Sequence, residues 1–100
     1  MALAEVSIIP IGTDDASFSD YVAACCKTLD EAGDVRYQVT PTATVIEGDF
    51  EKVMQAVKKM HQAPFDKGCA RVVTSITIDE RRDKPATMET TVEAVMEELH

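Results

Sequence analysis

The order of two kinds of hydrophobic pattern does most to restrict the fold of this chain. Residues 3–11 form a β-branched, apolar run, and residues 70–79 alternate apolar and polar side chains. Between these runs, two segments with helical spacing flank a pair of short β-rich pieces. Alternation predicts strands and a period near 3.6 predicts helices. The predicted order is therefore strand, helix, strand, strand, helix, strand, followed by one more helix.

The two internal helices have recognisable boundaries. Ser17 and Asp20 form an S-x-x-D capping signal for the first helix, which should end at Gly33. Asp49 lies where an N-cap belongs before the second helix, which should end near Pro64 and Gly68. We expect both helices to cover the same face of an antiparallel sheet.

The C-terminal helix is predicted to follow Thr87, which can cap it. Its apolar residues form one stripe: Met88, Val92, Val95 and Leu99. Its outer face is acidic. The stripe could pack on its own subunit or on a neighbour, and the sequence leaves both open.

The predicted fold class is α+β, a ferredoxin-like βαββαβ antiparallel sheet with an additional C-terminal helix. The middle strands, residues 35–40 and 42–47, form a hairpin around Pro41, whose ring suits a turn. One hundred residues suit a single domain, so we expect residues 1–100 to fold as one ferredoxin-like unit.

Composition removes several functional classes. The net charge of −8 disfavours binding to nucleic acid or to an anionic membrane surface, because both need a basic face. No apolar run is long enough to span a bilayer, and the first residues lack the basic flank of a signal peptide, so we expect a cytoplasmic protein. The cysteines Cys25, Cys26 and Cys69 lack the spacing of a zinc or redox motif.

The sheet face opposite the helices should be rich in hydroxyl groups and poor in charge. Counting every second residue assigns to it Glu5, Ser7, Ile9, Gln38, Thr40, Thr42, Thr44, Ile46, Arg71, Val73, Ser75, Thr77 and Asp79. Such a face suits close approach by another sheet, which predicts homo-oligomers. A plain threonine-rich exposed sheet is the alternative, because threonine favours strands.

Motifs for catalysis are missing from the sequence. The four glycines form neither a phosphate-binding loop nor a dinucleotide fingerprint, and His61 stands alone near the end of the second helix. We therefore expect no enzyme activity and no cofactor. A hydrolase or transferase that uses Glu47, Asp79 or His61 is the competing hypothesis.

Three segments resemble one family, the small thiamine-binding proteins of ferredoxin-like fold. They are PIGTDDASFSDYVA at 10–23, TPTATVIEGDFEKVMQAVKKMH at 40–61 and GCARVVTSITIDERRDK at 68–84. The resemblance implies a cytoplasmic homotetramer, a dimer of dimers, that binds thiamine or its hydroxymethylpyrimidine part without catalysis. This chain has Thr42-Ala43 where the family commonly has Met-Gly, which could alter ligand choice. A regulatory or structural oligomerisation module that binds a protein partner is the alternative.

Thiamine combines a hydrogen-bonding aminopyrimidine with a cationic ring, so its receptor needs hydroxyl groups, flat apolar surface and a nearby carboxylate. The candidate ligand-binding residues are Glu47, Thr44, Thr40, Thr42, Ser7, Thr13, Ser17, Ser19 and Asp79. Glu47 could instead serve as a favourable charge at the start of the second helix. Thr13, Ser17 and Ser19 could instead form turn and capping hydrogen bonds.

The segment Glu80-Arg81-Arg82-Asp83 puts two arginines into an acidic chain. Arginine makes two-pronged contacts with carboxylates and phosphates. Arg81, Arg82 and Arg71 are therefore candidates for subunit contacts or for holding an anion. A solvated turn with local ion pairs is the alternative.

Overall fold

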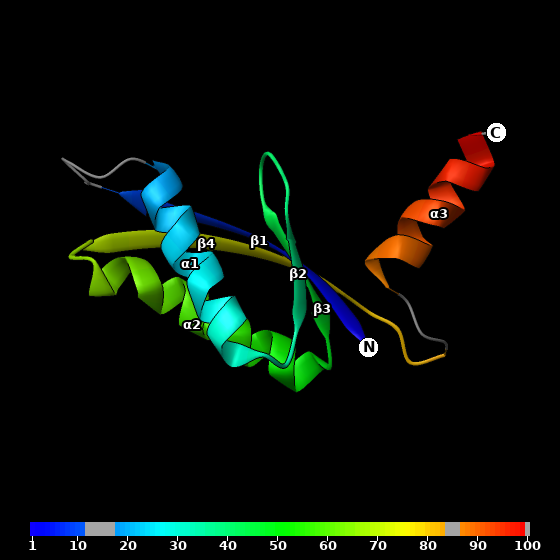
Figure 1. Ribbon diagram of the computed structural model, residues 1–100, viewed down its shortest axis with the longest axis horizontal. Helices are drawn as coiled ribbons and strands as arrows, with labels where there is room; N and C mark the ends of the chain where they lie inside the picture. Colours follow the sequence, from blue (N-terminus) through cyan, green and yellow to red (C-terminus); the bar gives the residue numbers. More distant parts are fainter. Residues whose placement is uncertain (12–17, 84–86, 100) are drawn as a thin grey trace.

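A computed structural model describes residues 1–11, 18–83 and 87–99, and Figure 1 shows their arrangement. The elements are β1 (Ala2–Ile11), α1 (Phe18–Ala32), β2 (Arg36–Val39), β3 (Thr44–Gly48), α2 (Phe50–Asp66), β4 (Arg71–Glu80) and α3 (Met88–Leu99). Among these described helices, none is both long and apolar enough to cross a membrane.

The four strands form one antiparallel sheet in the order β2-β3-β1-β4. Helices α1 and α2 pack on the same face of this sheet, while α3 extends beyond its end (Figure 1). This is the predicted ferredoxin-like βαββαβ sheet with an additional C-terminal helix, and the prediction of fold class is confirmed.

The core lies between the sheet and the two covering helices. Its largest fully buried side chains are Leu29, Ile46, Met60, Val6, Val53 and Pro64. They come from both helices and from the two central strands, as the apolar stripes in the sequence require. Burial of these side chains is the main source of stability.

The hairpin changes which residues of β3 face the helices. Thr44 and Ile46 were expected on the open face, but they pair with Val6 and Ala4 and are buried beneath the helices. The expectation was wrong because it carried the alternation of β2 unbroken through the loop. Gln38 in fact pairs with Val45, so even positions of β2 share a face with odd positions of β3.

Helix α2 begins as predicted but caps differently. Asp49 occupies the N-cap position, yet its side chain makes no capping hydrogen bond; its carbonyl accepts from the Val53 N–H at 2.8 Å. The helix continues through Pro64 to Asp66. Proline lacks an N–H, so the Met60 carbonyl has no helical donor at that position. The Cys25 thiol donates to this carbonyl at 3.4 Å and thereby links α1 to α2.

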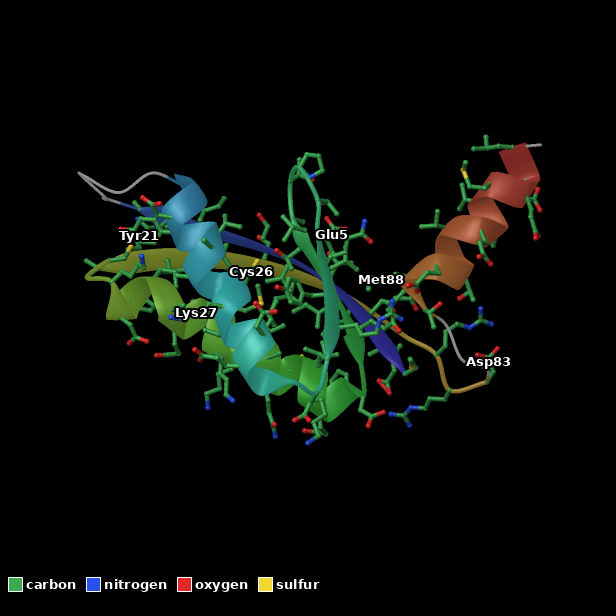
Figure 2. The ribbon with its side chains drawn as sticks, in the orientation of Figure 1. Glu5, Tyr21, Cys26, Lys27, Asp83 and Met88 are labelled. Atoms are coloured by element: carbon green, nitrogen blue, oxygen red, sulfur yellow. The ribbon has the colours of Figure 1, made fainter. Side chains whose placement is uncertain are left out.

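Helix α3 begins after the predicted cap, because Thr87 Oγ1 accepts from the Thr90 N–H at 3.1 Å. None of its side chains is buried against the described residues. Figure 2 shows Met88 at the end of α3 nearest the body, with the following side chains standing away from it. Beyond the half-buried Met88, the apolar stripe of α3 (Val92, Val95 and Leu99) is therefore not packed against the described residues of its own subunit.

Candidate functional site

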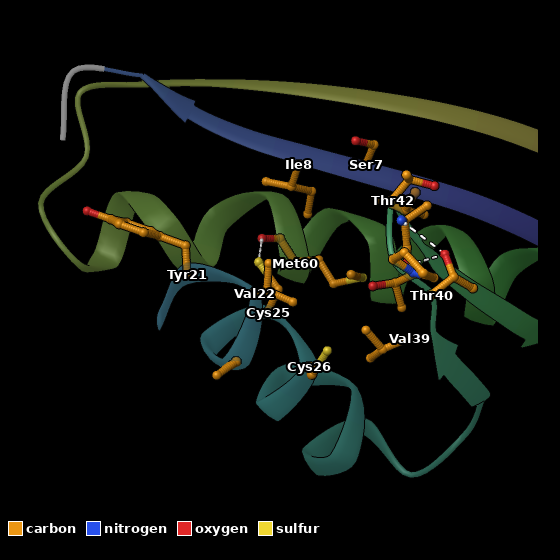
Figure 3. Close-up of a pocket in the computed structure, with 15 residues that line it drawn as sticks. Ser7, Ile8, Tyr21, Val22, Cys25, Cys26, Val39, Thr40, Thr42 and Met60 are labelled. Carbon is orange, nitrogen blue, oxygen red and sulfur yellow. Dashed lines mark hydrogen bonds between the residues drawn. The ribbon is translucent and has the colours of Figure 1, made fainter. Parts of the chain in front are cut away.

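A cavity of about 480 Å³ lies between α1 and the tip of the β2–β3 hairpin. Its lining comes from β1, α1, α2 and the hairpin (Figure 3): Val6, Ser7, Ile8, Tyr21, Val22, Ala23, Cys25, Cys26, Val39, Thr40, Pro41, Thr42, Ala43, Thr44 and Met60. A volume of this size lies in the range of roughly 300–1,000 Å³ that is typical of small-molecule sites. The cavity is thus the first candidate for a ligand site.

The apolar walls of the cavity follow from the amphipathic patterns. Val6 and Ile8 project from the helix-covered side of β1, and Val22 and Cys26 come from successive turns of α1. Met60 of α2 also lines the cavity. These side chains offer flat apolar surface rather than charge.

The hairpin loop brings a row of threonines to the opposite wall. Thr40 Oγ1 donates to the Ala43 carbonyl at 2.9 Å and accepts from the Ala43 N–H at 3.1 Å, while the Thr40 N–H donates to the same carbonyl at 2.8 Å. These bonds fix the loop and occupy the Thr40 hydroxyl. Thr42 lies at the exposed tip, and Thr44 lies at the buried end of the row.

Two neighbouring thiols line the α1 side of the cavity. Burial, followed by the adjacent Cys26, raises the pKa of Cys25 to about 11. Burial also raises the pKa of Cys26, against the opposing effect of a hydrogen bond from Thr44. Both thiols are therefore protonated near neutral pH, which makes them weak nucleophiles.

No charged side chain is among the lining residues that the structure describes. A cation inside the cavity would lose its hydration without gaining a counter-charge, which is costly. In the described ranges, no group of three or more histidine, cysteine, aspartate or glutamate side chains could hold a metal ion. The cavity best suits a neutral, flat group with a few hydrogen-bonding atoms.

The cavity brings together four of the candidate ligand-binding residues, Thr40, Thr42, Thr44 and Ser7. The Ser7 side chain points to the side of β1 opposite Ile8, so its hydroxyl faces away from the helices (Figure 3). Thr44 is the strongest of the four, because its hydroxyl is buried at the cavity and reaches Cys26.

Glu47 lies outside this cavity and holds the base of α3. Its side chain is only 3% exposed, and its carboxylate accepts from Arg36 at 3.3 Å and from the Met88 N–H at 3.0 Å. Arg36 also pairs with Glu89 in the first turn of α3. The carboxylate therefore has partners within its own subunit, at a helix N-terminus where negative charge is favoured.

The remaining candidates lie on the sheet or beyond its ends. Asp79 and Arg71 are exposed at opposite ends of β4. Arg81 donates to Asp83 at 2.9 and 2.7 Å, and Arg82 donates to Glu80 at 3.0 Å, so both arginines form local ion pairs. Thr13 and Ser17 lie outside the described residues, and Ser19 belongs to the first turn of α1 without a described side chain.

Most of the apolar lining was not predicted from the sequence, including Tyr21, Val22, Cys26, Val39 and Met60. Each fits a helical or strand pattern, so each was accounted for by packing. One feature of the sequence could have indicated a cavity here. The apolar stripe of the first helix contains Cys25, where a larger side chain would fill the space next to the hairpin at Pro41. A small residue there leaves space that a leucine would fill.

Together, the fold and this cavity define a small α+β domain of ferredoxin-like type with a ligand-sized, mainly apolar cavity under its first helix. The chain belongs to the thiamine-binding protein family, whose sequence model matches residues 4–96. The family name indicates a thiamine-related role, and binding rather than catalysis.

Relatives match along almost the whole chain. The protein YqgV of Bacillus subtilis is 46% identical over 102 residues, with 99% of this chain and 98% of that protein covered. A solved structure of a hypothetical protein from Methanocaldococcus jannaschii has a TM-score of 0.85 at 38% identity, with 96% of each chain covered.

One further solved structure shares the fold at low identity. It is a Thermotoga maritima protein described as a candidate thiamine biosynthesis/salvage protein, with a TM-score of 0.76 at 22% identity. The match covers 94% of this chain and 97% of that one. This similarity supports the fold assignment.

Proposed function

We propose that the protein is a non-catalytic, cytoplasmic homo-oligomer that reversibly binds thiamine or its hydroxymethylpyrimidine part, for salvage, buffering or delivery of the vitamin. One observation carries this proposal: a chain of the thiamine-binding family has a cavity of about 480 Å³ beside its threonine-rich hairpin, with no charged side chain among the lining residues that the structure describes. The family provides the ligand class, and the cavity provides space for it.

The chemistry of the lining favours the aminopyrimidine half of thiamine inside the cavity. That ring is neutral and flat, and its amino group and ring nitrogens can bond to hydroxyl groups such as that of Thr44. The thiazolium ring carries a permanent positive charge and finds no carboxylate among the described lining residues. It should remain at the mouth of the cavity, in contact with solvent.

Calorimetric titration tests this assignment with three ligands: hydroxymethylpyrimidine, thiamine and thiamine monophosphate. We expect all three to bind with affinities within about tenfold of one another, because the buried half is shared. Absence of heat with all three ligands on folded protein would overturn the proposal. A strong preference for the phosphate would instead direct attention to Arg81 and Arg82.

Two variants with matched controls locate the site. Thr44→Val removes a buried hydroxyl at nearly constant volume, and Thr91→Val makes the same change at an exposed position of α3. Cys26→Phe fills the cavity, and Lys27→Phe adds the same ring at an exposed position of α1. The first member of each pair should weaken binding at least tenfold, and the control should not.

Self-association through the open sheet face remains part of the proposal. The hydroxyl-bearing residues Ser7, Ser75 and Thr77 lie on that face, which α1 and α2 leave uncovered. A homotetramer built as a dimer of dimers should appear in sedimentation. Changing Arg81 and Arg82 together to alanine should shift it towards smaller species if these arginines contact a neighbour, and an unchanged profile would restrict them to local pairs.

A second function, an oligomerisation module that binds a protein partner, is favoured by α3. This helix exposes Val92, Val95, Met96 and Leu99 and buries none of its side chains against the described residues. The titrations separate the two functions, since a module of this kind would give no heat with thiamine or its pyrimidine.

A further inference from the structure

Two walls of the cavity continue past the residues that line it. Val22 and Cys26 line the cavity from successive turns of α1, and Asp30 follows Cys26 one turn later on the same face of that helix. Val39 lines the cavity from β2, and Tyr37 lies two residues earlier on the same face of that strand. Figure 3 shows Cys26 pointing towards Val39. Asp30 and Tyr37 are therefore the next side chains along two walls that face each other.

A hydrogen bond joins these two side chains. The Tyr37 hydroxyl donates to Asp30 Oδ1 at 2.7 Å. Tyr37 is half-buried and packs against the core, whereas Asp30 is exposed. This bond is the main reason that the pKa of Tyr37 is raised, so the phenol stays neutral near pH 7. The packed tyrosine thus holds an exposed carboxylate in a fixed position.

The Asp30 carboxylate lies within electrostatic reach of the cavity. Burial is the largest effect that raises the pKa of the Cys26 thiol, and the negative charge of Asp30 raises it further. Asp30 takes part in none of the ion pairs within the described part of the chain. Glu47, in contrast, is buried and already paired with Arg36. Asp30 can therefore offer its charge to a cation at the mouth of the cavity.

We propose that Asp30 and Tyr37 form the subsite for the thiazolium ring of thiamine, at the mouth of the cavity. The face of a tyrosine ring attracts an organic cation, and the carboxylate adds a counter-charge. The neutral pyrimidine enters the cavity, while the positive ring stays outside and keeps part of its hydration. This inference rests on the proposed function and adds the residues that distinguish thiamine from its neutral half.

A matched pair of ligands separates charge from size. Thiamine is compared with a neutral analogue in which carbon replaces the charged thiazolium nitrogen. Calorimetric titration of the unsubstituted protein should give about fivefold tighter binding for thiamine, since exposed cation–π contacts and exposed ion pairs are each weak. Equal affinities for the two ligands would overturn the inference.

Asp30→Asn removes the charge and keeps an oxygen that can accept from the Tyr37 hydroxyl. Its affinity for thiamine should fall about fivefold, and its affinity for hydroxymethylpyrimidine should stay within about twofold. Glu31→Gln is the matched control, because it removes an exposed negative charge from the next position of α1. This control should change neither affinity, which excludes a general effect of the negative charge of the chain.

Two variants of Tyr37 test the aromatic ring. Tyr37→Phe keeps the ring and loses the bond to Asp30, whereas Tyr37→Leu loses both. The preference for thiamine over the neutral analogue should fall from about fivefold to about threefold in the first variant and to less than about twofold in the second. Circular dichroism checks that both variants are folded. An unchanged preference in folded Tyr37→Leu would show that the ring does not contact the cation.

The titrations also separate this inference from the proposed function. If neither thiamine nor hydroxymethylpyrimidine binds to the folded, unsubstituted protein, the proposed function fails and this inference fails with it. If both bind and Asp30→Asn leaves the affinity for thiamine unchanged, only the inference is overturned. An equal loss of affinity for thiamine and hydroxymethylpyrimidine in Asp30→Asn would also overturn it, because the residue would then act on the whole cavity.

Discussion

Helices α2 and α3 are both amphipathic, yet among the described residues only α2 has a surface of its own subunit to pack against. Helix α2 buries Val53, Ala56, Val57, Met60, Ala63 and Pro64, whereas α3 buries no side chain against the described residues. The difference arises from connectivity: α2 crosses between two strands of one sheet and returns over its face, while α3 follows the last strand. An apolar stripe thus predicts a helix and its buried side, but not the surface that buries it.

Shortening a buried side chain of α2 should have the largest effect on the free energy of unfolding. Met60 is 1% exposed in the core, and Met60→Ala should lower the free energy of unfolding by about 2–5 kcal/mol because it leaves a cavity. Val92→Ala on α3 should change it by less than about 0.5 kcal/mol at protein concentrations that give monomers. Urea unfolding measures both. Similar losses would mean that α3 is packed as well as α2.

Titration of Cys25 tests the contact between α1 and α2. Its raised pKa, about 11 against an ordinary value of 9.0, means that its stabilising contribution is complete below pH 9. The contribution is lost as the pH rises through about 11, because the unfolded chain releases the proton first. The loss should be at most about 2–3 kcal/mol.

Other groups also titrate above pH 9, so the prediction concerns the difference between the unsubstituted protein and Cys25→Ala. Urea unfolding from pH 8 to 11 should show a steeper fall for the unsubstituted protein. Parallel curves would mean that the thiol does not gain stability from remaining protonated next to the Met60 carbonyl.

The contacts that attach α3 should contribute less to the free energy of unfolding than the core packing of α2, but the contribution should be measurable. Glu47→Gln removes the buried charge that pairs with Arg36 while keeping an oxygen for the Met88 N–H, so it should cost about 1–3 kcal/mol. The first-turn amides of α3 should then exchange faster with solvent. Glu93→Gln, on the exposed surface of the same helix, is the control and should change neither quantity.

Structural features that depend on neighbouring residues in the sequence could be predicted, whereas features that depend on residues far apart in the sequence could not. The strands, the helices and the ferredoxin-like order followed from local periodicity, because each element shows its own apolar pattern in consecutive residues. The facing of Thr44 and Ile46 did not follow, since it depends on how the hairpin loop changes the alternation. Helix α2 ends between Pro64 and Gly68, as predicted, but the bond from the Cys25 thiol to the Met60 carbonyl could not be predicted, because the thiol comes from another helix.

The candidate site was predictable only in part, for the same reason. Thr40, Thr42 and Thr44 were identified from the hairpin, and they do border the cavity. Glu47 was selected for its charge, but its nearest partners turned out to be Arg36 and the backbone of α3, more than forty positions along the chain in the latter case. The opposite wall, formed by α1, could be assigned only after the helix was placed on the sheet.

The smallest effect concerns the ion pair at the base of α3. This pair joins Arg36 to Glu89, and the hydrogen bond from Arg36 lowers the pKa of the Glu89 carboxyl below its ordinary value of 4.5. The stabilising contribution of this pair is therefore complete above pH 4.5 and is lost as the pH falls through the lower pKa of the folded protein. Solvent exposure and salt should keep the effect on overall stability small.

An NMR titration of the Glu89 side-chain carboxyl carbon measures this shift directly. In Arg36→Ala the midpoint should rise towards 4.5, whereas Lys52→Ala, which removes an exposed cation paired with Asp34, should leave it unchanged. An unchanged midpoint in Arg36→Ala would mean that the pair does not persist in solution. In that case the described polar contacts that attach α3 would be reduced to the bond between Glu47 and the Met88 N–H, and the contrast with the packed helix α2 would be greater still.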